Sequence, residues 1–235
     1  DYLTRLEQGR DSRPSAEVVN ALATALRMTR DERMHLSKLA MLPHVQPMCP
    51  KPAELQPRVR ALLDRLDPTP AFVIDRLANV LAWNTTWGAL AEPLGYLDDE
   101  HPNLARYVFT HPSARTVYDD WSTAADEQAG RLRAATAMHP DDPALRELLA
   151  ELQPLPEFAR RWDAYALHEK FAGTKALRHP ALGLLRIEYQ LLWVADTDQA
   201  IIAWLPDDEH TAAAFEALVS VRPESPARLR LVGGD

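Results

Sequence analysis

The sequence predicts a mixed fold: a small all-α segment at the N-terminus, then an α+β domain with one antiparallel five-stranded sheet and flanking helices. Three observations predict it. Short helical patterns fill the first 40 residues, prolines crowd the next stretch, and the remainder passes from two strand patterns through helices to three strand patterns and a last helix. Strands and helices segregated along a chain in this way are typical of an antiparallel α+β domain.

The first 40 residues contain three short helical patterns. Leu3 and Leu6 stand at helical spacing before Gly9, a residue typical of a helix end. A second helix is expected from Ser15 to about Arg27, and a third begins near Thr29. Three helices of this size bury too little apolar surface to fold alone. We therefore expect the chain, which begins with Asp1, to be a fragment of a longer gene product.

A proline-rich linker separates this segment, residues 1–42, from the rest. Prolines remove backbone donors and favour extended structure, so residues 43–57 form the predicted domain boundary. Five prolines stand in this stretch: Pro43, Pro47, Pro50, Pro52 and Pro57.

The second domain is predicted over residues 58–221, with a tail at 222–235. An amphipathic helix runs from Val59 to Leu66. Two short apolar runs flank a tight turn and predict a β-hairpin. The remaining elements follow from period and composition. The predicted ranges are strands at 71–75 and 79–83, helices between 87 and 166, strands at 175–178, 183–194 and 199–205, and a helix at 212–219.

Composition excludes several classes of protein. The single cysteine, Cys49, cannot form an internal disulfide. The longest charge-free stretch, 15 residues from Leu77 to Ala91, is too short and polar to span a membrane. No secretion signal opens the chain, so a cytoplasmic location is expected. The chain carries a net charge of −8, but residues 1–40 hold seven basic and six acidic residues, so the acidic excess resides in the rest of the chain.

No catalytic or metal-binding motif is present, so neither an enzyme nor a cofactor is predicted. The sequence lacks a Gly-x-Ser-x-Gly elbow, a Walker loop and a His-Glu-x-x-His pair. Four of the eight histidines directly precede proline, a position that disfavours helix, and therefore mark element boundaries. A haem held by one histidine stays open as an alternative. The four histidines are His101, His111, His139 and His179.

Residues 2–10, followed by Arg13, Pro14 and Ser15, resemble the recognition helix and following turn of the Cro/C1-type (XRE family) helix-turn-helix. The resemblance covers about 40 residues and implies a double-stranded DNA operator as partner and a homodimer. It places Arg5 against a guanine edge and Arg10 against phosphate. A solvated helix with balanced charge is the alternative. The predicted DNA-binding residues are Asp1, Thr4, Arg5, Gln8, Arg10 and Arg13.

Residues from about 58 to 221 resemble the MmyB-like ligand-binding domain, a family with a PAS-like fold that follows such a DNA-binding head. The resemblance rests on residues 66–75 and 79–84, on Tyr118-Asp119-Asp120-Trp121, and on His139-Pro140-Asp141-Asp142-Pro143. It implies a transcription regulator whose sensor domain binds a small molecule. A partner-binding adaptor and an enzyme that uses an aromatic pocket are the alternatives.

An apolar cavity for a hydrophobic ligand, such as a fatty acid, is expected between the sheet and its helices. Core packing is the competing role for each aromatic residue. A carboxylate ligand also needs a cation, for which Arg106, Arg115, Arg178 and Arg186 are candidates. The predicted ligand-binding residues are Phe72, Trp83, Trp87, Phe109, Trp121, Tyr165, Tyr189, Trp193 and Trp204.

Overall fold

The computed structural model describes residues 4, 8, 14, 16–28, 32, 33, 36, 40, 55–164, 172–194 and 197–220. In the N-terminal segment it describes helix α2, Ala16–Ala25, within the predicted second helix. Thr4 is helical, and the Gln8 amide donates to its carbonyl at 3.1 Å. Residues 41–54, which make up most of the predicted linker, and the tail at 222–235 lie outside the described residues.

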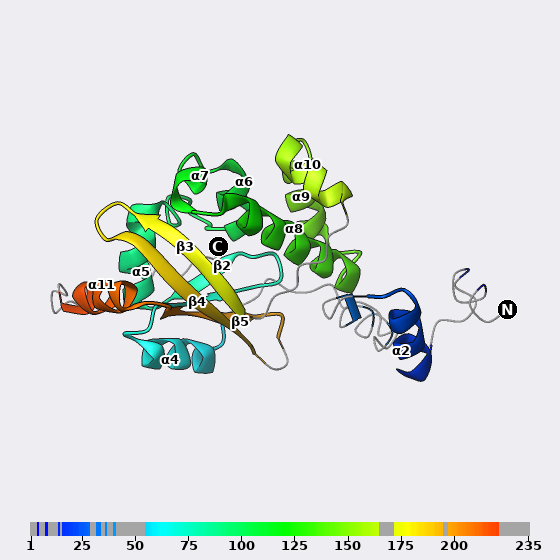
Figure 1. The fold of residues 1–235 in the computed structure, drawn as a ribbon, viewed down its shortest axis with the longest axis horizontal. Helices are drawn as coiled ribbons and strands as arrows, with labels where there is room; N and C mark the ends of the chain where they lie inside the picture. The colour runs from blue at the N-terminus through cyan, green and yellow to red at the C-terminus, as the bar shows by residue number, and fades with distance from the viewer. Residues whose placement is uncertain are drawn as a thin grey trace.

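The predicted antiparallel sheet is confirmed, with five strands in the order β2-β1-β5-β4-β3 (Figure 1). Every neighbouring pair is antiparallel. The central strand β5 therefore joins the N-terminal hairpin to the C-terminal one. The strands are β1 Ala71–Ile74, β2 Val80–Trp83, β3 Ala172–His179, β4 Gly183–Trp193 and β5 Ala200–Pro206.

Asp75 closes the turn of the first hairpin. Its carboxylate accepts hydrogen bonds from the backbone amides of Leu77 and Asn79, each at 2.9 Å, and from the Asn79 side chain. This pattern, in which an aspartate holds the backbone two residues on, is a common turn device. Burial raises the pKa of this carboxyl. The turn fixes the register in which Phe72 lies opposite Trp83.

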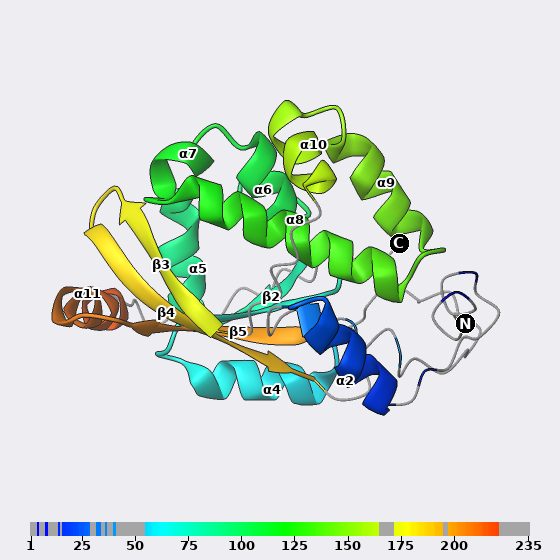
Figure 2. The same ribbon diagram turned by 45° about the vertical axis from the view of Figure 1, so that its right-hand side comes forward.

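The helices cover both faces of the sheet, as Figures 1 and 2 show. Helix α4 lies on one face, here called the α4 face, and the helices from α5 to α10 lie over the other, here called the α8 face. The helical elements are α4 Pro57–Leu66, α5 Thr85–Ala91, the 3-10 turn η1 Glu92–Leu94, α6 Leu104–Thr110, α7 Ala114–Val117, α8 Trp121–Met138, α9 Pro143–Leu152, α10 Pro156–Asp163 and α11 Glu209–Ser220.

Local sequence explains where these helices begin. Asn84, Asn103, Asp120 and Asp142 cap α5, α6, α8 and α9, and each side chain accepts a backbone hydrogen bond from the first turn. Helix α4 instead begins with Pro57, the last residue of the predicted linker, whose missing amide costs nothing at a helix start. Among the described residues, none of the helices is long and apolar enough to cross a membrane.

The alternation of each strand divides the core into two layers. On β1, Phe72 and Ile74 join the core of the α8 face, whereas Ala71 and Val73 join that of the α4 face. The α4 layer is built from small aliphatic side chains around Leu63, which is completely buried. The α8 layer contains the large aromatic residues and, as described next, a cavity.

Candidate ligand-binding site

A cavity of about 400 Å³ lies on the α8 face of the sheet. Strands β1, β4 and β5 form one wall and helix α8 forms another. The α8 residues that line it recur at helical spacing, so a single face of this helix borders the cavity. The lining residues of α8 are Glu127, Gln128, Arg131, Ala134, Ala135 and Met138.

Four of the predicted ligand-binding residues line this cavity. Phe72 and Trp204 meet edge to face, with ring centroids 5.6 Å apart, and are almost completely buried. Tyr189 pairs with Trp204 across β4 and β5. Trp193 stands at the end of β4 with 53% of its surface exposed. Aromatic strand residues therefore form much of one wall.

The other predicted residues lie elsewhere. Trp87 has no exposed surface and packs behind Phe72, with ring centroids 4.5 Å apart, while Trp83 packs against Trp87. Phe109 contacts Phe158 and Trp121 in the layer between α6, α8 and α10. These four residues, Trp83, Trp87, Phe109 and Trp121, support the domain core outside the cavity lining. Tyr165 lies outside the described residues.

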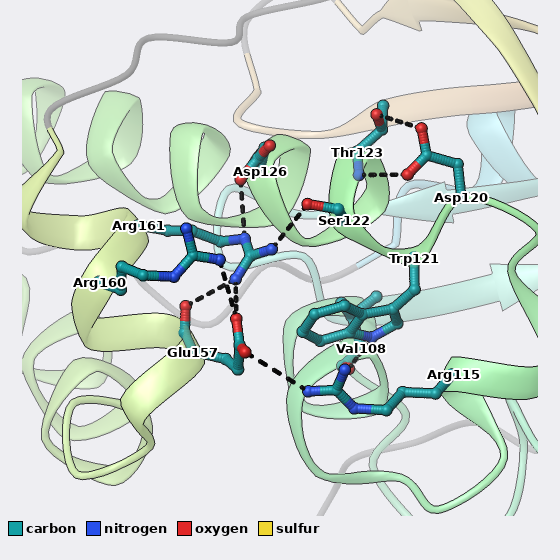
Figure 3. A network of polar contacts seen from close by, with 10 residues as sticks. All are labelled: Val108, Arg115, Asp120, Trp121, Ser122, Thr123, Asp126, Glu157, Arg160 and Arg161. Carbon is teal, nitrogen blue, oxygen red and sulfur yellow. Dashed lines mark hydrogen bonds and ion pairs between the residues drawn. The ribbon is translucent and has the colours of Figure 1, made fainter.

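Trp121 belongs to a polar clamp between α8 and α10, drawn in Figure 3. The guanidinium of Arg115 stacks against its ring, 3.7 Å from the ring centroid, and the Trp121 Nε1 donates to the Val108 carbonyl. Arg161, which is buried, pairs with Asp126 at 2.7 Å and also with Glu157. These bonds hold the helix whose other face borders the cavity.

The end of the cavity near Met138 and Trp193, here called the outer end, is open. Its polar groups pair with other side chains of the protein. Met138 and Trp193 are both partly exposed there. Arg76 pairs with Asp142 at 2.6 Å, and His139 lies 3.6 Å from Asp198. The His139 ring lowers the pKa of the Asp198 carboxyl. Pairing thus joins the β4–β5 turn to the end of α8.

The opposite end of the cavity, near Glu127 and Gln128, is here called the inner end. It contains both charged side chains and deeply buried polar ones. Tyr189 donates its hydroxyl to Glu127 at 3.2 Å, and the Lys175 ammonium lies 4.4 Å from the Tyr189 ring centroid. Burial, the largest cause, raises the pKa of the Tyr189 hydroxyl. Gln128 is only 6% exposed, and its Oε1 has no hydrogen-bond partner among the described residues. Two cations, Arg131 and Lys175, accompany the single carboxylate of Glu127 at this end.

A second, polar cavity of about 240 Å³ adjoins the inner end. It shares Tyr118, Glu127 and Lys175 with the first cavity. Tyr118 accepts a hydrogen bond of 2.6 Å from Tyr96, and burial raises the pKa values of both hydroxyls. The inner end therefore borders further polar space, whereas the outer end opens between exposed apolar side chains.

The cations predicted from the sequence lie outside the first cavity and have carboxylate partners. Arg106 pairs with Glu151, Arg115 with Glu157, Arg178 with Asp119, and Arg186 with Asp208. The cavity is instead lined by Arg76, Arg131, Lys175 and His139. Sequence reasoning missed these residues. One signal was available for Arg131, because Gln128, Arg131 and Met138 recur at helical spacing together with two alanines and so share one helix face.

The predicted DNA-binding residues fall on a segment of which little is described. Thr4 and Gln8 are exposed, as a DNA-facing helix surface requires. Asp1, Arg5, Arg10 and Arg13 lie outside the described residues.

A five-stranded sheet that carries a largely apolar cavity under one helix defines the second domain as a candidate small-molecule sensor. Comparison with protein families shows to which family the chain belongs. Residues 55–218 match the MmyB-like transcription regulator ligand binding domain, and the chain therefore belongs to that family. Residues 1–36 match a helix-turn-helix domain. No curated protein matches the chain significantly. The chain is thus a transcription regulator with a DNA-binding head and a ligand-binding domain.

Proposed function

We propose that the sensor domain binds an apolar small molecule with an acidic head group, such as a fatty acid, and thereby changes the operator affinity of a Cro/C1-type head. The cavity carries this proposal. Its length along α8, from Glu127 to Met138, is about 16 Å at the usual helical rise, which suits an extended chain. Phe72, Ile202 and Leu191 supply an apolar wall.

Ligand binding can act on DNA only through a difference in affinity between two states of the sensor. Helix α8 is a suitable transmitting element because one face lines the cavity and the other is clamped to α10 through Arg161. A regulator of this design is a homodimer, since two heads are needed for two operator half-sites. Its place of action, with the DNA, is the cytoplasm.

The test uses the full-length protein and dodecanoate. An operator is first selected from a random duplex library, and its affinity is then measured by fluorescence anisotropy at fixed salt. Dodecanoate is expected to shift the operator Kd by about fivefold to 150-fold, the usual range of allosteric coupling. Ala134→Phe fills the cavity and is expected to abolish this shift while leaving ligand-free DNA binding intact. An operator Kd that does not respond to dodecanoate contradicts the proposal.

The head is tested separately. Arg5→Ala should relax base discrimination at one operator position, at a cost of about 1–3 kcal/mol. Arg10→Ala should weaken binding to all sequences and reduce the salt dependence, because a phosphate contact is lost. Unchanged binding in both variants would contradict the assignment of the recognition helix.

A further inference from the structure

We propose that the ligand carries a hydroxyl close to its acid group, and that it binds with this head at the inner end of the cavity and its tail toward Trp193. The class of ligand is therefore a 3-hydroxy fatty acid or a close analogue. The inference rests on the proposed function, because it specifies the occupant of the same cavity.

The two ends of the cavity differ in the hydrogen-bond and ion-pair partners of their polar groups. At the outer end, Arg76 pairs with Asp142 and His139 with Asp198. Asp75 is held by three hydrogen bonds within its own turn. A ligand head placed there would have to displace these partners. The outer end is thus suited to the tail, which passes between Met138 and Trp193.

Gln128 at the inner end presents the opposite case. A buried polar atom that lacks a hydrogen bond destabilises the folded state, so such atoms usually have a partner in the functional state. The Gln128 Oε1 is buried in a cavity-lining side chain and has no partner among the described residues. A ligand group can supply the missing bond without breaking any that exists.

A hydroxyl fits this position better than a carboxylate alone. The two ends of a glutamine amide can exchange by rotation, and the amide then offers either an acceptor or a donor. A hydroxyl both donates and accepts, so it satisfies the amide in either orientation. A carboxylate only accepts, so it satisfies the amide in one orientation alone.

The charges at the inner end favour an acid beside that hydroxyl. Among the residues that line the first cavity at this end, the cations Arg131 and Lys175 outnumber the carboxylate of Glu127. At the outer end, two carboxylates and one arginine line the cavity. An anionic head is therefore attracted inward and is disfavoured at the opening.

The experiment compares three probes on the full-length protein by calorimetry: dodecanoate, 3-hydroxydodecanoate and 12-hydroxydodecanoate. We expect 3-hydroxydodecanoate to bind about fivefold more tightly than dodecanoate, the effect of one added hydrogen bond. The 12-hydroxy isomer should gain nothing, because its hydroxyl reaches the outer end. Equal affinities for dodecanoate and 3-hydroxydodecanoate, or tightest binding of the 12-hydroxy isomer, overturn the inference.

Gln128→Met keeps an unbranched side chain but removes the amide. It should abolish the preference for 3-hydroxydodecanoate, so that the variant binds 3-hydroxydodecanoate and dodecanoate with equal affinity. Gln153→Met, at an exposed glutamine outside the cavity, is the matched control and should retain the preference. If Gln128→Met fails to fold, the wild-type comparison of the three probes still decides. If none of the probes binds, the proposed function fails; if dodecanoate binds without discrimination, only this inference fails.

Discussion

The two faces of the sheet are built from the same strands yet have different roles. On the α4 face, small residues such as Ala71 and Ala203 pack under α4 around Leu63. On the α8 face, the alternate residues of the same strands are larger, as with Phe72 and Trp204, and they border a cavity of about 400 Å³. Small side chains allow a helix to pack close to a sheet, whereas large rigid rings keep a helix layer at a distance.

This difference teaches that the period-two alternation of a strand can separate stability from binding. A protein interior normally has few voids larger than a water molecule. The side chains on the α4 face form a buried cluster in keeping with this rule, and they contribute mainly to folding. The α8 face departs from it, and part of the stability that full packing would give is exchanged for space in which a ligand fits.

The largest expected effect compares the same truncation on the two faces. Leu63→Ala should destabilise the protein by about 2–5 kcal/mol, because a closed core must either keep a void or collapse. Leu191→Ala, on the α8 face, should cost less than Leu63→Ala, since Leu191 already borders a cavity and loses fewer contacts. Urea unfolding at constant m-value gives both free energies. Equal losses would break the comparison.

The reverse change, from a small to a large side chain, can be made at two alanines of β5. Ala203→Leu crowds the α4 face and should cost about 1–3 kcal/mol. Ala200→Leu projects toward the cavity, has room, and should change the free energy of unfolding by less than Ala203→Leu. It should nevertheless weaken dodecanoate binding at least tenfold, measured by calorimetry, whereas Ala203→Leu should bind normally once folded. A cavity variant that binds dodecanoate as well as the wild type would contradict the assignment.

The fold was predictable because its elements follow local rules. Apolar runs, a change of period and strand-favouring composition marked the strands, and the last helix was expected at 212–219. It begins earlier, at Glu209, because the Asp208 side chain accepts from the Thr211 amide at 2.7 Å and so organises the first turn. Caps of this kind extend helices beyond their apolar stripe.

The candidate site was predictable only in part. Phe72 and Trp204 are aromatic residues on strands, and the resemblance to a ligand-binding family favoured them. Trp121 is also aromatic and was favoured by the same resemblance, but it lies on α8, and its place between Arg115 and Arg161 depends on how α7 and α10 pack, which no local pattern specifies. Gln128 and Lys175 were missed for the converse reason, since polar residues are by default expected to face solvent.

The smallest expected effect concerns the polar pairs at the outer end of the cavity, such as His139 with Asp198. Because His139 lowers the pKa of Asp198 in the folded state, the carboxylate contributes stability above its ordinary pKa of about 4. That contribution is lost as the pH falls through the lowered pKa.

Asp198→Asn should therefore cost less than about 1 kcal/mol at pH 5.5, as for other partly exposed pairs, and the cost should decrease as the pH is lowered toward 3. Asp64→Asn, which removes the exposed Arg60–Asp64 pair of α4, is the matched control and reports the effect of losing an ordinary surface pair. Urea unfolding of the wild type and both variants between pH 3 and pH 7 gives the difference directly. A cost of Asp198→Asn that is the same at pH 5.5 and pH 3 would show that the outer end does not depend on this carboxylate's charge, and that the two faces of the sheet differ in packing alone.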